Sequence, residues 1–147
     1  MKNNFSIAIH GGAGTLVKGL MTEELEAQYE AALDQALEAG YAILRRDGIA
    51  LDAVETAVNH LENSPLFNAG KGAVFTNAET NELDASIMDG KTLNAGASAG
   101  TTTVRNPINL ARAIMEKSEH VMLSGQGAET FAEEQGLITV ETEYFYT

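Results

Sequence analysis

A hairpin signal near the middle of the chain constrains its fold more than any other feature. Leu83 to Met88 alternates apolar and polar side chains, which is typical of a strand with one buried face. The expected buried face holds Leu83, Ala85 and Ile87, and the opposite face holds Asp84, Ser86 and Met88. Asp89-Gly90 then favours a tight turn, and Leu93 to Val104, rich in Ala, Gly and Thr, is expected to be a closely packed strand. The chain should therefore contain a sheet that is at least partly antiparallel.

Two helices are expected before this hairpin. Thr22 is a suitable N-cap, acidic residues fill the turn after it, and Asp47-Gly48 is a stop signal, so the first helix should run from Glu23 to Arg46. The second helix begins near Leu51 and places apolar side chains three and four residues apart on one face. It must end before Ser64-Pro65, because proline disfavours helical geometry in the residue before it.

A strand near the N-terminus and three elements after the hairpin complete the pattern. Phe5 to His10 alternates and is expected to form a strand, which runs into the turn Gly11-Gly12-Ala13-Gly14. Asn106-Pro107 supplies an N-cap and a first-turn proline for a third helix. His120 to Leu123 predicts a short strand, and Ala128 to Gln135 predicts a helix that a glycine ends.

Composition narrows the possible functions. The chain has 147 residues and a formal net charge of -12 at pH 7, which argues against nucleic acid or an anionic membrane as its partner. The absence of cysteine excludes a disulfide, a thiolate metal site and a cysteine nucleophile. We find no secretory signal and no membrane-spanning stretch, so we expect a cytoplasmic protein with an unused glycosylation sequon at Asn4. With no repeat or linker, residues 1–147 are expected to form a single domain.

The search for a nucleophile or a nucleotide site gives little. Ser98 fits the pattern Gly-x-Ser-x-Gly, but it lies inside a predicted strand and not on the strand-to-helix turn that a nucleophile elbow needs. His10-Gly11-Gly12 is compatible with an oxyanion-binding loop and equally with a tight turn after a strand. Gly70-x-Gly72 lacks the third glycine of the dinucleotide fingerprint.

Metal ligands are only weakly indicated. The three histidines are far apart in the sequence, at His10, His60 and His120. The acidic residues around the hairpin are better explained by solvation than by a hard-cation site; they are Glu79, Glu82, Asp84 and Asp89. The glycine-rich segment from Leu61 to Gly72 could gather backbone carbonyls around a monovalent cation, an arrangement that leaves no side-chain signature. Asn68, in the same segment, is expected to be buried and to cap local backbone in preference to contacting a substrate.

Several blocks taken together resemble the plant-type asparaginase family, whose members are also called isoaspartyl peptidase/L-asparaginases. The blocks are Ile7 to Gly14, Pro65 to Thr76, Glu82 to Gly90, Asn106 to Arg112, Val121 to Leu123 and Gly127 to Glu129. No block is decisive, but the set spans nearly the whole chain in order and is highly specific. The resemblance implies an α/β fold of the N-terminal-nucleophile hydrolase type. This is a four-layer αββα sandwich, to which the chain would contribute the α-subunit part.

The resemblance also implies a division of labour. Members of the family are made as precursors that cut themselves, and a threonine at the start of the new β subunit attacks the amide with its own α-amino group as base. Thr147 would carry a terminal carboxylate, so the nucleophile is expected on a β partner and no catalytic residue is expected on this chain. The expected supporting residues are His10, Gly11, Gly12 and Asn68. A structural sodium ion, the one expected cofactor, would be held by the backbone carbonyls of Leu61, Glu62, Ser64, Phe67, Ala69 and Lys71.

The implied activity is hydrolysis of the side-chain amide of L-asparagine and of β-aspartyl peptides by an (αβ)2 assembly acting on small molecules. Two alternatives stay open. A glycosylasparaginase of the same fold is disfavoured by the apolar surroundings of Phe67 and of Ala73 to Phe75. A non-catalytic module could instead use the glycine loops to bind an anion. If the family reading holds, one layer of the sandwich should be incomplete in this chain and should expose apolar surface.

Overall fold

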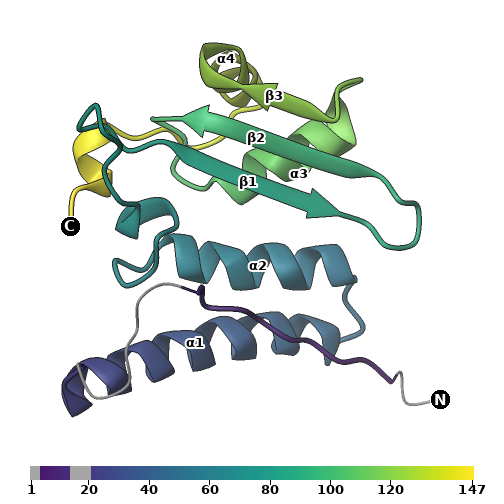
Figure 1. Cartoon of the computed structure of the whole chain (residues 1–147). Coiled ribbons are helices and arrows are strands. Elements are labelled where there is room, and N and C mark those ends of the chain that lie inside the picture. Colours follow the sequence, from purple (N-terminus) through teal and green to yellow (C-terminus); the bar gives the residue numbers. More distant parts are fainter. Residues whose placement is uncertain (1–3, 14–20) are drawn as a thin grey trace.

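A small mixed sheet with helices packed against it forms the centre of the molecule (Figure 1). The structure is a computed structural model that describes residues 4–13 and 21–147. The helices are α1 (Glu23–Leu44), α2 (Ala50–Glu62), α3 (Pro107–Lys117) and α4 (Gly125–Glu134), with short 3-10 turns η1 (Gly70–Gly72) and η2 (Thr142–Phe145). The strands are β1 (Leu83–Met88), β2 (Ala95–Thr101) and β3 (Met122–Ser124). In the order β1-β2-β3, the first pair is antiparallel and the second parallel, so the α/β class and the hairpin are confirmed.

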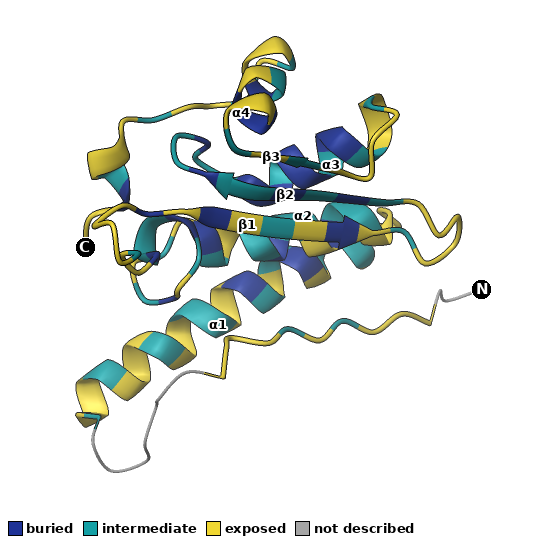
Figure 2. Ribbon diagram, turned by 45° about the horizontal axis from the view of Figure 1, so that its top comes forward, coloured by how far each residue is buried: buried dark blue, intermediate teal, exposed yellow. Residues whose placement is uncertain are grey.

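One face of the sheet is buried beneath helices. β1 alternates between buried and exposed residues as predicted, which Figure 2 shows as stripes along the strand. Ile87 of β1 packs with Ile108 and Ala111 of α3 and with apolar side chains of α2. The small residues of β2 allow α3 to approach closely: a Cβ on Gly96 would lie 2.1 Å from the Ala111 carbonyl oxygen. Glycine at this position is therefore required by the contact between β2 and α3.

The opposite face of the sheet carries exposed apolar side chains. Met88 and Met122 are 56% and 54% exposed on it. A wide, shallow hollow of about 450 Å³ lies over Ser86, Ala97 and Ala99 of the same face. Within the part of the chain that the structure describes, this sheet thus has one covered and one open face.

The helices α1 and α2 form a hairpin held by small side chains (Figure 1). Ala36 of α1 and Ala53 and Ala57 of α2 are almost completely buried between them. A Cβ on Gly40 of α1 would lie 2.8 Å from the Ala53 carbonyl oxygen, so the two backbones are nearly in contact. This close approach places the end of α2, and the loop after it, beside the N-terminal segment.

The strand expected at Phe5 to His10 is wrong for the described residues. Residues 4–13 lie extended along the α1–α2 hairpin, with the Phe5 ring 5.2 Å from the Tyr41 ring and Ile7 against Gly40. Ile7 and Ile9 are half-buried between exposed neighbours, so the segment alternates in burial without forming a strand. A strand also needs hydrogen bonds to a neighbouring strand, and no described strand lies beside this segment.

The remaining bounds agree with expectation to within a few residues. The Thr22 hydroxyl accepts a hydrogen bond from the Leu25 N–H at 3.2 Å, as an N-cap should, and α1 ends at Leu44. α2 ends at Glu62, before the proline. β3 begins two residues after its predicted start, and α4 begins three residues before its predicted start. Residue 14 of the expected glycine turn lies outside the described residues.

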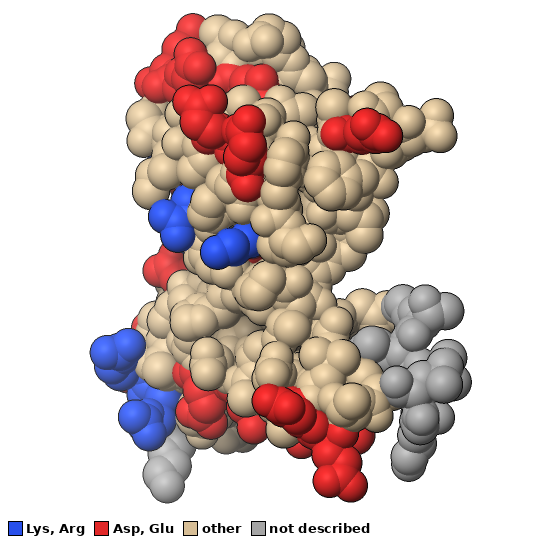
Figure 3. Space-filling model, turned by 90° about the vertical axis from the view of Figure 1, so that its left-hand side faces the viewer, with Lys and Arg blue, Asp and Glu red and all other residues tan. Residues whose placement is uncertain are grey.

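The surface charge and the hydropathy of the helices bear on whether nucleic acid or a membrane could be a partner. Asp and Glu side chains cover more of the face shown in Figure 3 than Lys and Arg do. None of the helices in the described ranges combines the length and the apolar content needed to cross a bilayer.

Candidate functional site

One cavity brings together the four residues expected to support catalysis. It has a volume of about 580 Å³, and His10, Gly11, Gly12 and Asn68 are all in its lining. The N-terminal segment supplies the first three of these residues, and the loop after α2 supplies Asn68. The α1–α2 hairpin holds these two segments side by side, because it packs against the first and leads into the second.

Aromatic and apolar side chains form the base of this cavity. Phe67 is 7% exposed, and its ring meets the ring of Tyr29 from α1 edge to face, with the centroids 5.6 Å apart. Gly11 lies against the same ring: a Cβ there would be 3.4 Å from Cε1 of Phe67. The lining of the cavity thus combines small residues with an aromatic pair.

Asn68 caps local backbone, but it is exposed and not buried. Its Oδ1 accepts a hydrogen bond from the Val74 N–H at 3.0 Å, so the prediction of a capping role is confirmed. The prediction of burial is wrong, because Phe67 takes the inward position in the loop and residue 68 points out to the cavity. The side-chain NH2 makes no hydrogen bond to any residue that the structure describes, which leaves two donors for a ligand.

His10 closes a tight turn on itself. The Gly12 N–H donates to Nδ1 of His10 at 3.2 Å. Gly12 has a φ of 112°, a conformation that favours glycine. Of the two interpretations left open for His10-Gly11-Gly12, this geometry favours the turn, since the Gly12 N–H already has an acceptor.

The loop from Leu61 to Gly72 folds its carbonyls around two glycines. A Cβ on Gly70 would lie 2.3 Å from the Glu62 carbonyl oxygen, and one on Gly72 would lie 2.2 Å from that of Phe67. Three of the six carbonyls expected to hold sodium already accept a backbone N–H, namely those of Leu61, Phe67 and Ala69. Each such oxygen keeps a second lone pair, so these hydrogen bonds do not prevent it from binding a cation. No three His, Asp or Glu side chains of the described ranges converge in a way that could hold a metal.

A buried glutamate ties this loop to α3. Glu62 is 3% exposed; its Oε1 accepts the Ile108 N–H at 2.9 Å and its Oε2 accepts Nδ2 of Asn106 at 3.0 Å. Burial raises the pKa of Glu62 to about 7, against the lowering effect of the hydrogen bonds from Asn106 and Ile108 and with a further rise from the nearby Glu55. Asn106 precedes α3 as predicted, but its side chain does not cap the helix. Glu62 supplies that cap from a distant part of the chain.

One feature of the sequence points to a special role for Glu62. Glu62 is an acidic residue in the last turn of α2, where the helix dipole disfavours negative charge. An unfavourable charge at a helix end, followed by a glycine-rich loop, is compatible with a buried carboxylate that is bound by hydrogen-bond donors from a distant part of the chain.

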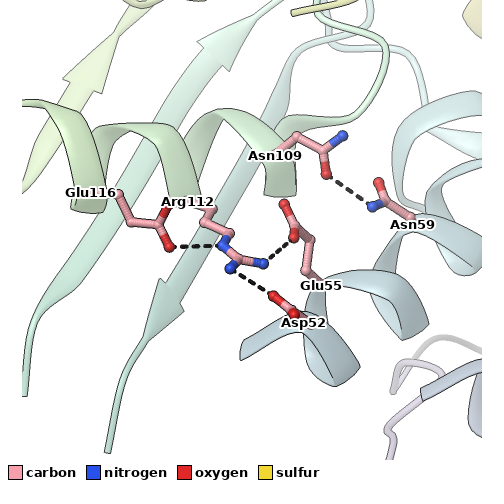
Figure 4. A network of polar contacts seen from close by, with 6 residues as sticks. All are labelled: Asp52, Glu55, Asn59, Asn109, Arg112 and Glu116. Carbon is pink, nitrogen blue, oxygen red and sulfur yellow. Dashed lines mark hydrogen bonds and ion pairs between the residues drawn. The ribbon is translucent and has the colours of Figure 1, made fainter. Parts of the chain in front are cut away.

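An ion-pair network fixes α2 against α3 (Figure 4). Arg112 of α3 binds Asp52 and Glu55 of α2 and Glu116 of its own helix. Nearby, Nδ2 of Asn59 donates to Oδ1 of Asn109 at 2.9 Å. Partial burial alone would lower the pKa of Arg112, but the hydrogen bonds to these carboxylates raise it above the ordinary arginine value.

The other sequence candidates lie elsewhere and have ordinary explanations. Ser98 is 2% exposed inside β2, with its hydroxyl 3.5 Å from the Pro107 carbonyl, so it is not on a nucleophile elbow. Asp84 accepts the Gly100 N–H at 2.8 Å, and Asp89 binds the N–H of Lys91 and the hydroxyl of Thr92. These contacts organise the hairpin and its loop.

Known proteins match this chain along almost its full length. A family model described as Asparaginase matches residues 3–147. The isoaspartyl peptidase of Salmonella typhimurium is 50% identical over 145 residues, which cover 99% of this chain and 46% of that protein. The isoaspartyl peptidase of Escherichia coli K12 is 52% identical over 141 residues, 96% of this chain and 44% of its own length. The plant-type L-asparaginase of Thermococcus kodakarensis is 51% identical over 127 residues, 86% of this chain and 40% of its own.

The chain belongs to the asparaginase family. It spans less than half the length of these curated relatives.

Proposed function

We propose that the chain is the α-subunit part of an isoaspartyl peptidase/L-asparaginase. The reaction is hydrolysis of the side-chain amide of L-asparagine and of β-aspartyl peptide bonds. The observation that carries the proposal is the cavity in which His10, Gly11, Gly12 and Asn68 meet, in a chain of this family. Relatives at about 50% identity that are named isoaspartyl peptidase and plant-type L-asparaginase support the substrate class.

In this proposal the cavity is one wall of an active site whose nucleophile, a threonine, belongs to a β partner. Asn68 would orient the reacting groups with its free NH2, while its Oδ1 stays bound to the Val74 N–H. The aromatic floor of Phe67 and Tyr29 would exclude water from one side of a small amide substrate. The residues of this chain would thus position the reacting groups and shield the substrate from water, and the β partner would supply the attacking group.

The β partner would also complete the fold. Its sheet would pack on the open face that carries Met88 and Met122, giving the four-layer αββα sandwich and an (αβ)2 assembly. The extended segment 4–13, with no strand beside it among the described residues, supports the same arrangement. The carbonyls around Gly70 and Gly72 would hold a structural sodium ion that fixes the loop carrying Asn68.

Intact-mass measurement of the protein expressed from its gene, combined with an activity assay, tests this proposal. We expect two chains, the second starting with threonine, and hydrolysis of both L-asparagine and the dipeptide β-Asp-Leu. Faster cleavage of a glycosylated asparagine would instead indicate a glycosylasparaginase. A cooperatively folding monomer of this chain alone, with no hydrolysis by any assembly containing it, would favour the anion-binding module.

A further inference from the structure

We propose that Glu62 is a positioning residue whose side chain fastens the site loop to α3 and thereby holds Asn68 at the cavity. The site loop is defined as residues 63–74. The proposal deepens the function proposed above and rests on it for the role of Asn68. Its structural part, the fastening of the loop, stands on contacts within this chain.

The first step is the anchor itself. Both oxygens of the buried Glu62 carboxylate are bound at the start of α3, one by the Ile108 N–H and one by the Asn106 side chain. These partners lie 44 and 46 residues further along the chain, so the contact is purely tertiary. α2 and α3 are already joined by the Arg112 network, which lies on other residues of α2. Glu62 therefore adds a separate fixed point at the end of α2, where the site loop begins.

The second step leads from Glu62 into the loop. Gly70 lies directly on the Glu62 main chain: a Cβ at Gly70 would be 2.3 Å from the Glu62 carbonyl oxygen and 2.8 Å from its Cβ. Gly70 has a φ of 52° and is buried. With no side chain between them, a shift of Glu62 must displace Gly70.

The third step leads from Gly70 to Asn68. The Gly70 carbonyl accepts the Ala73 N–H at 3.0 Å, and the next residue, Val74, donates to Oδ1 of Asn68 at 3.0 Å. The Ala73 carbonyl is held in turn by Nδ2 of the buried Asn81 at 2.8 Å. A displacement of Glu62 would therefore move the Asn68 side chain, because one main-chain contact and two hydrogen bonds connect them.

The test compares two buried glutamates in the protein expressed from its gene. Glu62→Gln keeps the shape of the side chain but replaces one of its two acceptor oxygens by an NH2, which cannot accept from the donor that faces it. The matched control is Glu129→Gln: Glu129 is 8% exposed and also accepts backbone N–H groups, those of Thr102 and Thr103, away from the site. For Glu62→Gln we expect hydrogen exchange at the Val74 amide to rise about tenfold, and kcat to fall about tenfold with little change in KM. Glu129→Gln should change neither quantity, even where it lowers the unfolding midpoint equally.

A rescue variant separates positioning from a general loss of stability. In Glu62→Gln/Asn106→Asp the new carboxylate can accept from the new NH2, and Oε1 can still accept the Ile108 N–H. We expect this double variant to regain the slow exchange of Val74. In contrast, Asn106→Asp alone sets two carboxylates against each other and should speed that exchange.

Two results would overturn the proposal. One is slow exchange at Val74 and unchanged kcat in Glu62→Gln despite a lowered unfolding midpoint; the other is an equal effect of Glu129→Gln. If Glu62→Gln fails to fold, a double variant that folds with fast Val74 exchange would also contradict it. If the unmodified protein hydrolyses neither substrate, the proposed function fails, while the exchange data still decide whether Glu62 fastens the loop.

Discussion

Asn68 shows how one side chain can carry two separable tasks. Its oxygen holds the Val74 N–H, and its NH2 is free of described partners. We predict that Asn68→Asp keeps the first contact and loses the second, because a carboxylate accepts but does not donate. Hydrolysis of β-Asp-Leu should fall at least about tenfold, while the free energy of unfolding changes by less than about 1 kcal/mol. Parallel kinetics and urea titrations measure the two quantities.

Asn68→Ala provides the comparison for that variant. It removes the acceptor as well, so it should lower both activity and stability, the latter by about 1 kcal/mol. Full activity in Asn68→Asp would show that the NH2 has no part in the reaction.

Substitutions of Gly70 and Gly100 distinguish the cost of backbone strain from the cost of a steric clash. Both have positive φ, 52° and 62°, but only Gly70 has atoms in the way of a Cβ. Gly100→Ala should therefore cost about 1–2 kcal/mol from its left-handed conformation alone. Gly70→Ala should cost clearly more, since its new Cβ would meet the Glu62 carbonyl oxygen. Equal losses in chemical denaturation would mean that the loop relaxes away from the contact.

At the scale of whole elements, the Arg112 network decides how firmly α2 and α3 are joined. Arg112→Ala would leave three carboxylates close together with no cation among them. We predict a loss of about 2 kcal/mol, measured by urea unfolding at pH 7.

Lys117→Ala is the matched control for that variant. Lys117 lies in the same helix, is exposed and makes no ion pair with a described residue. Its removal should change stability by less than about 0.5 kcal/mol. A similar loss in both variants would point to helix propensity and not to the network.

The elements show which parts of the fold were predictable from sequence. β1, α1 and α2 were predicted nearly to the residue, because side-chain period, caps and proline act locally. The structure of segment 4–13 was not predicted correctly, because a strand needs a neighbouring strand, which the local sequence does not specify. The cap of α3 was misassigned to Asn106 for a related reason, since the acceptor comes from Glu62, 46 residues away.

The candidate site was predictable only in part. The residues His10, Gly11, Gly12 and Asn68 came from family resemblance, and their meeting in one cavity depends on how closely α1 and α2 pack. That packing is set by small residues such as Gly40, whose significance is visible only when the facing backbone is known. Neither the exposure of Asn68 nor the anchor at Glu62 follows from the loop sequence alone.

For the molecule as a whole, Glu129 predicts a weakness towards acid. Burial alone would raise its pKa, but hydrogen bonds from Thr102 and Thr103 outweigh this and lower it below the ordinary glutamate value. An acid with a lowered pKa in the folded state stabilises the fold above its unfolded pKa, and this stability is lost as the pH falls through the folded pKa. The free energy of unfolding should therefore fall on acidification below about pH 4.5.

Glu129→Gln isolates this contribution. The variant should be less stable than the unmodified protein at pH 7, and the difference should narrow as the pH falls. Thermal unfolding followed at a series of pH values would show it. A constant difference at every pH would place the acid sensitivity on other carboxylates.

The extended segment 4–13 has a consequence for the order of assembly. Its main-chain groups form no backbone hydrogen bonds with the rest of the described chain, so folding of the helices and the small sheet does not complete it. If the part of the precursor that becomes the β subunit supplies those bonds, this last ordering step takes place within one molecule, before the precursor is cut. The rate of that step is then independent of protein concentration, as is the packing of Ile7 and Ile9 on the α1–α2 hairpin.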